Sequence, residues 1–231
     1  MSFKLDVVIA VPGLPMNWDT LEKQSLGGSE TAGLSMAKAL AKQGHNVILF
    51  CNTTDPGKKP DGVLYMSLSQ FHPFVTTSPV DVVIAQRMPE LFAMKMASKL
   101  NILWCHDLAM LRSADKFKSV LWNIDKVMTV SQYMTEQYKE VYGLPDELFW
   151  TTRNGIDLDL IDAVTSKIEI RQPKQLVYAA RPERGLDVLL ESIMPKLWEK
   201  DPEITLKVCG YDNTTPEMQP FHDYLNSLIA Q

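Results

Sequence analysis

The sequence lacks the features that would place it across a membrane, in an oxidising compartment or on a nucleic acid. No apolar run in its 231 residues approaches the roughly 20 residues that a membrane-spanning helix needs. Its net charge of −5 argues against nonspecific nucleic-acid binding. It has only three cysteines, Cys51, Cys105 and Cys209, unclustered and each at the end of an apolar run. They indicate buried, reduced thiols, so we expect a cytoplasmic globular protein with no nucleic-acid partner.

Seven short apolar runs before residue 155 have the length and the Val/Ile content of buried strands. The first of them is broken too quickly by Pro12-Gly13 to be a signal peptide. The predicted strands span 5–11, 46–51, 63–68, 80–85, 101–105, 126–130 and 147–153, and the predicted helices between them span 29–43, 90–99 and 132–142. Strands that alternate with helices at this spacing predict an α/β fold, a Rossmann-like doubly wound parallel sheet.

A second, smaller β-α-β pattern follows a linker-like segment at 171–174. Its predicted strands span 175–180 and 204–209, and its predicted helices span 185–200 and 218–230. We therefore expect a complete N-terminal domain over 1–170 and a partial C-terminal domain over 171–231. With a single neighbour, strand 175–180 leaves one long edge bare, and such an edge favours pairing with a second copy into a homodimer.

A glycine-rich turn, Gly27-Gly28-Ser29-Glu30, leads from the first strand into its helix. Backbone N–H groups at such a helix start can approach a phosphate closely, although glycines at turns often serve conformation alone. The G-x-G-x-x-G spacing is missing, and so is an acid at the end of the second strand. Both absences argue against a dinucleotide cofactor.

Two arginines, Arg181 and Arg184, lie between strand 175–180 and the helix that Gly185 opens. Open α/β sheets bind ligands at the carboxyl ends of strands, and helix amino ends favour anions. Guanidinium groups suit phosphate oxygens, so the pattern indicates a diphosphate site. The alternative is a solvated ion pair of either arginine with Glu183, which would contribute little.

A second polar pair, His106-Asp107, follows the predicted strand 101–105 at the same functional edge of the sheet. The alternative is a histidine packed under a loop, with Asp107 capping a turn. Asp157-Leu158-Asp159 has the D-x-D pattern of a metal site, but it lies in a turn that starts a helix. We therefore reject the metal interpretation and expect no metal.

These segments, in this order, resemble the motifs of GT-B glycosyltransferases of the GT4-like (glycosyl transferases group 1) family. The stretch Ala-Arg-Pro-Glu-Arg-Gly-Leu-Asp at 180–187 is similar to the signature that opens that family's second domain. Gly-Gly-Ser-Glu, His-Asp, Val-Ser and Asn-Gly-Ile-Asp are similar to four further motifs of the family. The resemblance covers essentially the whole chain.

The resemblance implies roles for the residues in these motifs. It implies that His106 and Asp107 act at the reacting centre as the catalytic pair. Ser131 and Asn154 would line the cleft, and we place Arg87 there as well, on the acceptor side. The residues expected to bind the donor diphosphate or sugar, with Gly210 added as the end of the last strand, are Gly27, Gly28, Ser29, Glu30, Arg181, Arg184 and Gly210.

The resemblance also implies an activity, the transfer of a sugar from a nucleotide diphosphate sugar to an acceptor hydroxyl. Transfer would proceed with retention of configuration and without a metal or other cofactor. The partners would be the nucleotide-sugar donor and a glycan, lipid or other hydroxyl acceptor, with peripheral membrane contact left open. The family's second domain runs on much further, through the stretch that holds the nucleotide's ribose, so we expect a partial second domain. Two alternatives stay open: a noncatalytic phosphate-binding or interaction remnant, and a GT-B-type nucleotide-sugar epimerase.

Overall fold

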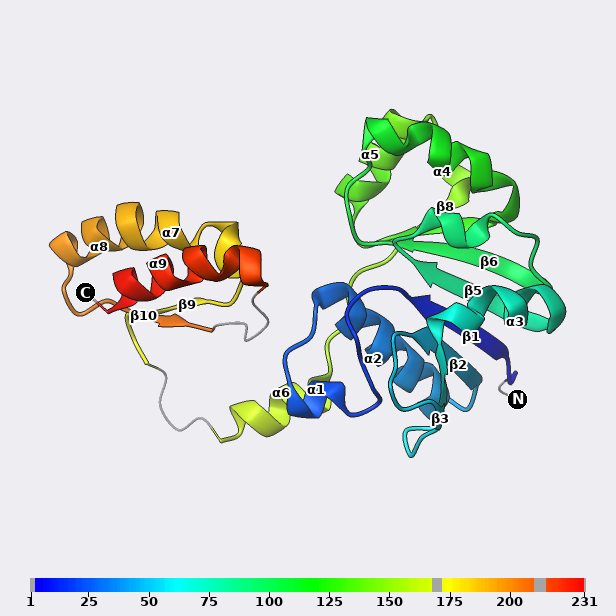
Figure 1. Ribbon diagram of the computed structural model, residues 1–231, viewed down its shortest axis with the longest axis horizontal. Helices are drawn as coiled ribbons and strands as arrows, with labels where there is room; N and C mark the ends of the chain where they lie inside the picture. The colour runs from blue at the N-terminus through cyan, green and yellow to red at the C-terminus, as the bar shows by residue number, and fades with distance from the viewer. Residues whose placement is uncertain (1–2, 168–171, 210–214, 231) are drawn as a thin grey trace. The chain divides into compact units, whose positions relative to one another are not determined.

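The computed structural model of the chain describes residues 3–167, 172–209 and 215–230 (Figure 1). The chain divides into two compact units, Met1–Ile156 and Asp157–Gln231, called unit 1 and unit 2 below. The domain boundary predicted between residues 170 and 171 lies outside the described residues.

Unit 1 is built on an eight-stranded sheet, and it confirms the predicted doubly wound α/β fold. The strand order is β3-β4-β2-β1-β5-β6-β7-β8, with every neighbouring pair parallel except β3 and β4. The strands are β1 (Asp6–Val11), β2 (Asn46–Cys51), β3 (Gly57–Lys58), β4 (Val63–Ser67), β5 (Val80–Gln86), β6 (Ser98–Cys105), β7 (Lys126–Thr129) and β8 (Phe149–Thr151). The helices are α1 (Thr20–Lys23), α2 (Gly28–Lys42), α3 (Phe71–Thr77), α4 (Ala114–Val120) and α5 (Gln132–Tyr142).

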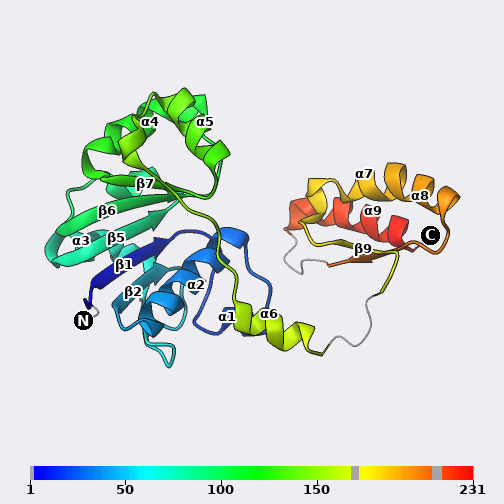
Figure 2. The ribbon, with the colours of Figure 1, turned by 180° about the vertical axis from the view of Figure 1, so that it is seen from behind.

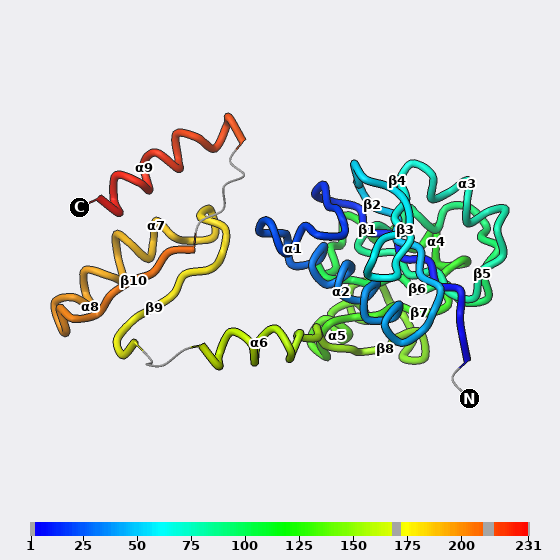
Figure 3. Tube along the Cα trace, turned by 90° about the horizontal axis from the view of Figure 1, so that it is seen from below, coloured from blue at the N-terminus to red at the C-terminus, as the bar shows by residue number. Residues whose placement is uncertain are grey.

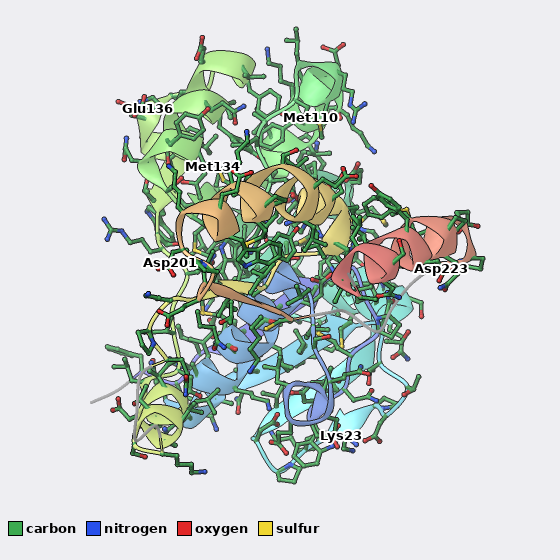
Figure 4. All side chains as sticks on the ribbon, turned by 90° about the vertical axis from the view of Figure 1, so that its left-hand side faces the viewer. Lys23, Met110, Met134, Glu136, Asp201 and Asp223 are labelled. Atoms are coloured by element: carbon green, nitrogen blue, oxygen red, sulfur yellow. The ribbon has the colours of Figure 1, made fainter. Side chains whose placement is uncertain are left out.

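The central strands carry apolar runs, such as 7–11 in β1 and 82–85 in β5, because helices cover both faces of the sheet. Successive side chains alternate between the faces, so Ile9 packs in one buried cluster with Leu34 of α2 while Val8 faces the cluster of α3, α4 and α5. Figure 2 shows α4 and α5 over β6 and β7, and α2 along β1 and β2. Helix α5 is amphipathic, with Met134 buried in the core and Glu136 in solvent (Figure 4).

The direction in which the sheet is built reverses between β1 and β5. From β1 the chain adds β2 and β4 on one side, and it then returns to add β5, β6, β7 and β8 on the other. The carboxyl ends of β1 and β5 are therefore the topological switch point, the place where doubly wound sheets bind their ligands.

One predicted helix, at 90–99, is wrong. The chain makes only a short 3-10 turn, Pro89–Phe92, and enters β6 at Ser98. Leu91 and Phe92 bury their side chains from this turn, and the Ala97 N–H donates to the Val75 carbonyl of α3 at 2.7 Å. The apolar residues that suggested a helix stripe are thus buried by a compact connection, which frees the residues from 98 onward to pair with β5.

Gly33 in α2 faces the sheet so closely that no side chain fits there. A Cβ at this position would lie 2.5 Å from Val11 Cγ2 and 3.1 Å from both amide atoms of Gln86. In an unobstructed helix alanine is favoured over glycine by about 1 kcal/mol. We expect Gly33→Ala instead to lower the free energy of unfolding by about 1–3 kcal/mol, the cost of overpacking.

Urea denaturation measures this change. The matched control is Gly28→Ala, where no described atom beyond the local chain lies within 4 Å of the added Cβ. A Gly33→Ala protein more stable than the parent would contradict the packing of α2 on the sheet.

Unit 2 holds a two-stranded parallel sheet, β9 (Gln175–Tyr178) and β10 (Thr205–Val208), which run side by side in Figure 3. This confirms the second predicted β-α-β pattern. Its helices are α6 (Leu158–Thr165), α7 (Leu186–Val188), α8 (Met194–Lys200) and α9 (Gln219–Ile229). Asp201, labelled in Figure 4, follows α8 and pairs with Lys174 at 2.8 Å. Among the described residues, the buried residues of this unit are Pro182, Leu186, Met194 and Leu225.

The helical segment 186–200 contains a π-helical stretch, Leu189–Ile193, between α7 and α8. Pro195 has no N–H to donate to the preceding turn, which favours the wider π geometry just before it. The stretch shifts the helix register by one residue. Met194 is therefore buried, whereas Ile193 is 45% exposed.

The three cysteines differ in burial between the two units. Burial raises the pKa of Cys51 to about 12 and that of Cys105 to about 12, so both thiols are unreactive in the native core of unit 1. Cys209, also predicted to be buried, is exposed because it follows β10 in the thin sheet of unit 2.

Across the described part of the chain, no helix has both the length and the apolar character that crossing a membrane requires.

Candidate functional site

Three polar segments follow the carboxyl ends of the strands at and beside the switch point. Residues 27–30 begin α2 after β1, residues 86–87 end β5, and residues 106–107 follow β6. Side chains from all three segments bond to one another: Arg87 donates to Asp107 Oδ2 at 2.6 Å and to Ser29 Oγ at 3.3 Å. The group formed by Ser29, Glu30, Gln86, Arg87, Trp104, His106 and Asp107 is called the switch-point cluster below.

Arg87 has a strained backbone. Its φ is 62°, and the Met88 N–H donates to the Gln86 carbonyl at 2.6 Å, which closes a three-residue γ-turn of the rare positive-φ kind. Such strain costs on the order of 1–3 kcal/mol and gathers at functional sites. The Arg87–Asp107 ion pair is largely solvent-exposed and adds little stability in return. The turn fixes where the guanidinium lies.

Glu30 is a buried carboxylate at the start of α2, with 5% of its surface exposed. It accepts hydrogen bonds from the Leu14 N–H at 3.2 Å and from Ser29 Oγ at 2.9 Å. A Cβ at Gly27 would lie 2.3 Å from Glu30 Oε2, so the glycine leaves the space that this carboxylate occupies. The glycine-rich turn thus places an anion against the helix amino end, where the helix dipole favours it.

His106 is half-buried between a glutamine and a tryptophan. Its Nε2 lies 3.2 Å from Gln86 Nε2, and its ring centroid lies 4.6 Å from that of Trp104. Burial lowers the pKa of His106 from its ordinary 6.5. Of the nearby charges, Asp107 raises this pKa, Arg87 lowers it and Glu30 raises it. The ring is therefore neutral near pH 7. Asp107, by contrast, is exposed and its carboxylate is held by Arg87.

The lowered pKa of His106 predicts acid sensitivity. Because the folded protein resists protonation of this ring, the unfolded chain binds the proton at a higher pH than the folded chain does. The free energy of unfolding should therefore fall as the pH drops below 6.5 and on through the lower pKa of the folded state.

Urea unfolding at a series of pH values measures this slope, and His106→Gln should remove the part that His106 contributes. His45, whose Nδ1 accepts from the Leu5 N–H at 3.3 Å, provides the control variant His45→Gln. Identical slopes for the parent and His106→Gln would show that the ring titrates as freely in the folded protein as in the unfolded chain.

Two residues of the switch-point cluster, Gln86 and Trp104, do not stand out in the sequence. Gln86 has no exposed surface and Trp104 is 3% exposed. Gln86 Oε1 and Trp104 Nε1 are the buried side-chain polar atoms that lack a hydrogen-bond partner within the described residues. In the sequence, Gln86 could have been found as the polar residue that directly follows the apolar run 82–85.

The predicted phosphate site of unit 2 lies directly after β9. Arg181 Nε pairs with Glu183 Oε1 at 2.8 Å with both side chains partly exposed, which is the predicted alternative ion pair. Arg184 ends a 3-10 turn and is exposed, and Gly185 has a φ of 98°, so a glycine suits the step into α7. Within the described residues, the Arg184 guanidinium makes no ion pair. Gly210 lies outside the described residues.

The remaining predicted residues have structural partners or exposed positions. Ser131 caps α5 by accepting from the Met134 N–H at 3.2 Å. Asn154 is exposed in the segment after β8. Asp157 caps α6 by accepting from the Leu160 N–H at 3.0 Å, so the predicted helix start is confirmed. In the described part of the chain, no three His, Cys, Asp or Glu side chains gather as metal ligands would.

Comparisons with known proteins agree with this architecture. The chain is similar to a glycosyltransferase from Rickettsia africae ESF-5, with a TM-score of 0.63 and 15% identity over 98% of this chain and 65% of that one. It is also similar to the wall teichoic acid polymerase TagF, with a TM-score of 0.52 and 9% identity over 90% of this chain and 55% of that one. The chain thus spans less than two thirds of the length of either protein, and these likenesses show the fold. A search of curated proteins gives no match.

The parallel-dominated sheet of unit 1 and these structural likenesses define a GT-B, Rossmann-like glycosyltransferase fold. The sequence profile of Glycosyltransferase Family 4 matches residues 26–160, more than half of the chain. The chain belongs to Glycosyltransferase Family 4.

Proposed function

We propose that this glycosyltransferase moves a sugar from a nucleotide diphosphate sugar to an acceptor hydroxyl, with retention of configuration and without a metal. The observation that carries the proposal is the switch-point cluster, in which a neutral, half-buried His106 contacts Gln86 and Trp104, and Arg87 links Ser29 to Asp107. Polar groups of this kind, at the ligand-binding edge of a doubly wound sheet, suit a sugar rich in hydroxyl groups.

The donor diphosphate is assigned to cationic and backbone groups. As the bond from the sugar's C1 to the leaving oxygen breaks, the sugar gains oxocarbenium character and negative charge develops on the diphosphate. Exposed guanidinium groups at Arg181 and Arg184 supply preorganised positive charge for such an oxygen. In unit 1 we assign the N–H groups of Gly27 and Gly28 to a donor phosphate, and the carboxylate of Glu30 to holding that turn in place.

We assign the acceptor by its chemical class. We propose a glycan, lipid or other hydroxyl acceptor at the loops of unit 1 near Arg87, whose guanidinium is held by Ser29 and Asp107. A lipid acceptor would add peripheral membrane contact. We place the reaction in the cytoplasm, which suits a chain with two native thiols buried in its core.

The proposal is tested at His106, which is expected to hydrogen-bond the transferred sugar. In a sugar-transfer assay, we expect His106→Ala to lower kcat/KM about tenfold, the scale of one lost neutral hydrogen bond. His72, a half-buried histidine of α3 that contacts the Leu91 carbonyl at 3.1 Å, provides the control variant His72→Ala.

The two variants separate function from folding. The His72→Ala protein should keep its transfer rate even if its melting temperature falls. Equal rates for His106→Ala and the parent, at a temperature where both are folded, would contradict the assignment of His106 to the sugar.

A further inference from the structure

Gln86 is held in one place by the surrounding backbone. Its side chain has no exposed surface and packs against the bare backbone of Gly33, where an added Cβ would lie 3.1 Å from both Nε2 and Oε1. A long polar side chain buried this closely has few alternative rotamers. Its amide is therefore a fixed group rather than a mobile one.

The strand register brings this amide to His106. Gln86 of β5 is the register partner of Trp104 of β6, and His106 lies two residues beyond Trp104. Residues two apart in an extended chain point to the same face of a sheet, as do register partners in neighbouring strands. The distances agree, with 3.2 Å between Gln86 Nε2 and His106 Nε2 and 4.6 Å between the Trp104 and His106 rings.

The orientation of the Gln86 amide, with its nitrogen toward the ring, determines the position of the histidine proton. An amide nitrogen donates hydrogen bonds and does not accept them. His106 Nε2 therefore accepts from Gln86 Nε2 and carries no proton itself. In a neutral imidazole the proton then lies on Nδ1.

We propose that Gln86 is a positioning residue that holds His106 in the tautomer protonated at Nδ1. His106 then presents an N–H donor, rather than a basic lone pair, to an oxygen of the transferred sugar. This role rests on the proposed function and makes it more specific. It assigns His106 to binding and polarising a sugar oxygen, and it excludes His106 as the base that takes the acceptor's proton.

The unpaired polar atoms around His106 indicate that the glutamine at position 86 serves function rather than stability. Gln86 Oε1 and Trp104 Nε1 lack partners within the described residues, and both residues contact His106. A buried polar atom without a partner destabilises the folded protein, because its lost contacts with water are not replaced. An apolar residue at position 86 would avoid that loss, so stability alone does not explain a glutamine at the end of an apolar strand.

The test is ¹⁵N NMR of the histidine rings in the ¹⁵N-labelled protein, near pH 7 and without substrate. His106→Asn assigns the His106 signals by their disappearance. In the parent we expect an unprotonated Nε2 and a protonated Nδ1. In Gln86→Glu, a carboxylate that accepts from the ring should move the proton to Nε2 and raise the pKa of His106. In Gln86→Met, which keeps the volume and removes the donor, the preference for Nδ1 should be lost.

The parent spectrum alone can overturn the proposal, so the test does not depend on the variants folding. A proton on Nε2 in the parent would show that Gln86 does not donate to the ring. A His106 tautomer unchanged in folded Gln86→Met would show that Gln86 does not set it. The signals of His45, which immediately precedes β2, should be the same in the parent and in both Gln86 variants.

Activity separates this inference from the proposed function. An Nδ1 proton that depends on Gln86, in a protein without sugar transfer, would support the positioning role and contradict the proposed function. Sugar transfer by a protein whose His106 carries its proton on Nε2 would overturn the positioning role alone.

Discussion

Replacing Arg184 by alanine is expected to weaken the binding of nucleoside diphosphates by about 10- to 100-fold. Hydrogen bonds to charged groups contribute about 1.5–3 kcal/mol, and 1.4 kcal/mol corresponds to a tenfold change. In sugar transfer the loss should be about 10²-fold or more, because negative charge grows on the leaving diphosphate. The melting temperature should stay nearly unchanged, since Arg184 is exposed. Calorimetric titration with UDP and GDP measures the affinity.

Two variants make this test specific. Arg184→Lys keeps the charge but loses the planar fork, so its affinity should fall between those of the parent and Arg184→Ala. Lys207 of β10 is an exposed cation in the same unit, and Lys207→Ala should leave the affinity unchanged. Equal losses for Lys207→Ala and Arg184→Ala would point to general electrostatics and contradict a diphosphate site at Arg184.

The backbone amides of β9 and β10 are expected to exchange hydrogen at least about 10³-fold faster than those of β1 and β5. This ratio corresponds to about 4 kcal/mol in the free energy of opening. A two-stranded sheet is marginal by itself, and four buried residues anchor it within the described residues of unit 2. Strands β1 and β5 are buried at the centre of an eight-stranded sheet.

Hydrogen exchange read by mass spectrometry, at two protein concentrations, also tests pairing through the edge of β9. In the described part of the chain β9 pairs only with β10, and pairing with a second copy would put the backbone groups of its other edge into hydrogen bonds. Protection of β9 that rises with concentration would show the homodimer. Uniform protection across both units in a monomer, established by light scattering, would contradict the expected weakness of unit 2.

The strands of unit 1 could be predicted because burial on both faces leaves a plain signal. The central strands contain runs rich in Val and Ile, as in 7–11 and 82–85, and all seven predicted strands are present. The segment 90–99 misled the prediction because apolar spacing does not distinguish a helix from a compact turn that buries the same side chains.

The site could be predicted in its parts but not in its connections. The polar residues at strand ends, such as His106 and Arg87, are visible in the sequence because they interrupt apolar runs. The burial of Gln86 depends on how closely Gly33 approaches it, and the left-handed backbone of Arg87 depends on a turn between two strands. These are tertiary features, and no local pattern encodes them.

The account is tested most directly by product analysis after incubation with nucleotide diphosphate sugars and a panel of hydroxyl acceptors in the presence of a chelator. We predict a glycoside whose anomeric configuration, read by NMR, is that of the donor, together with one released nucleoside diphosphate per sugar transferred. A donor sugar epimerised without transfer, a glycoside of inverted configuration, or transfer that stops when the chelator is added would each contradict the account. So would binding of the nucleotide sugar with no product from any acceptor, which is the result expected of a noncatalytic binding protein.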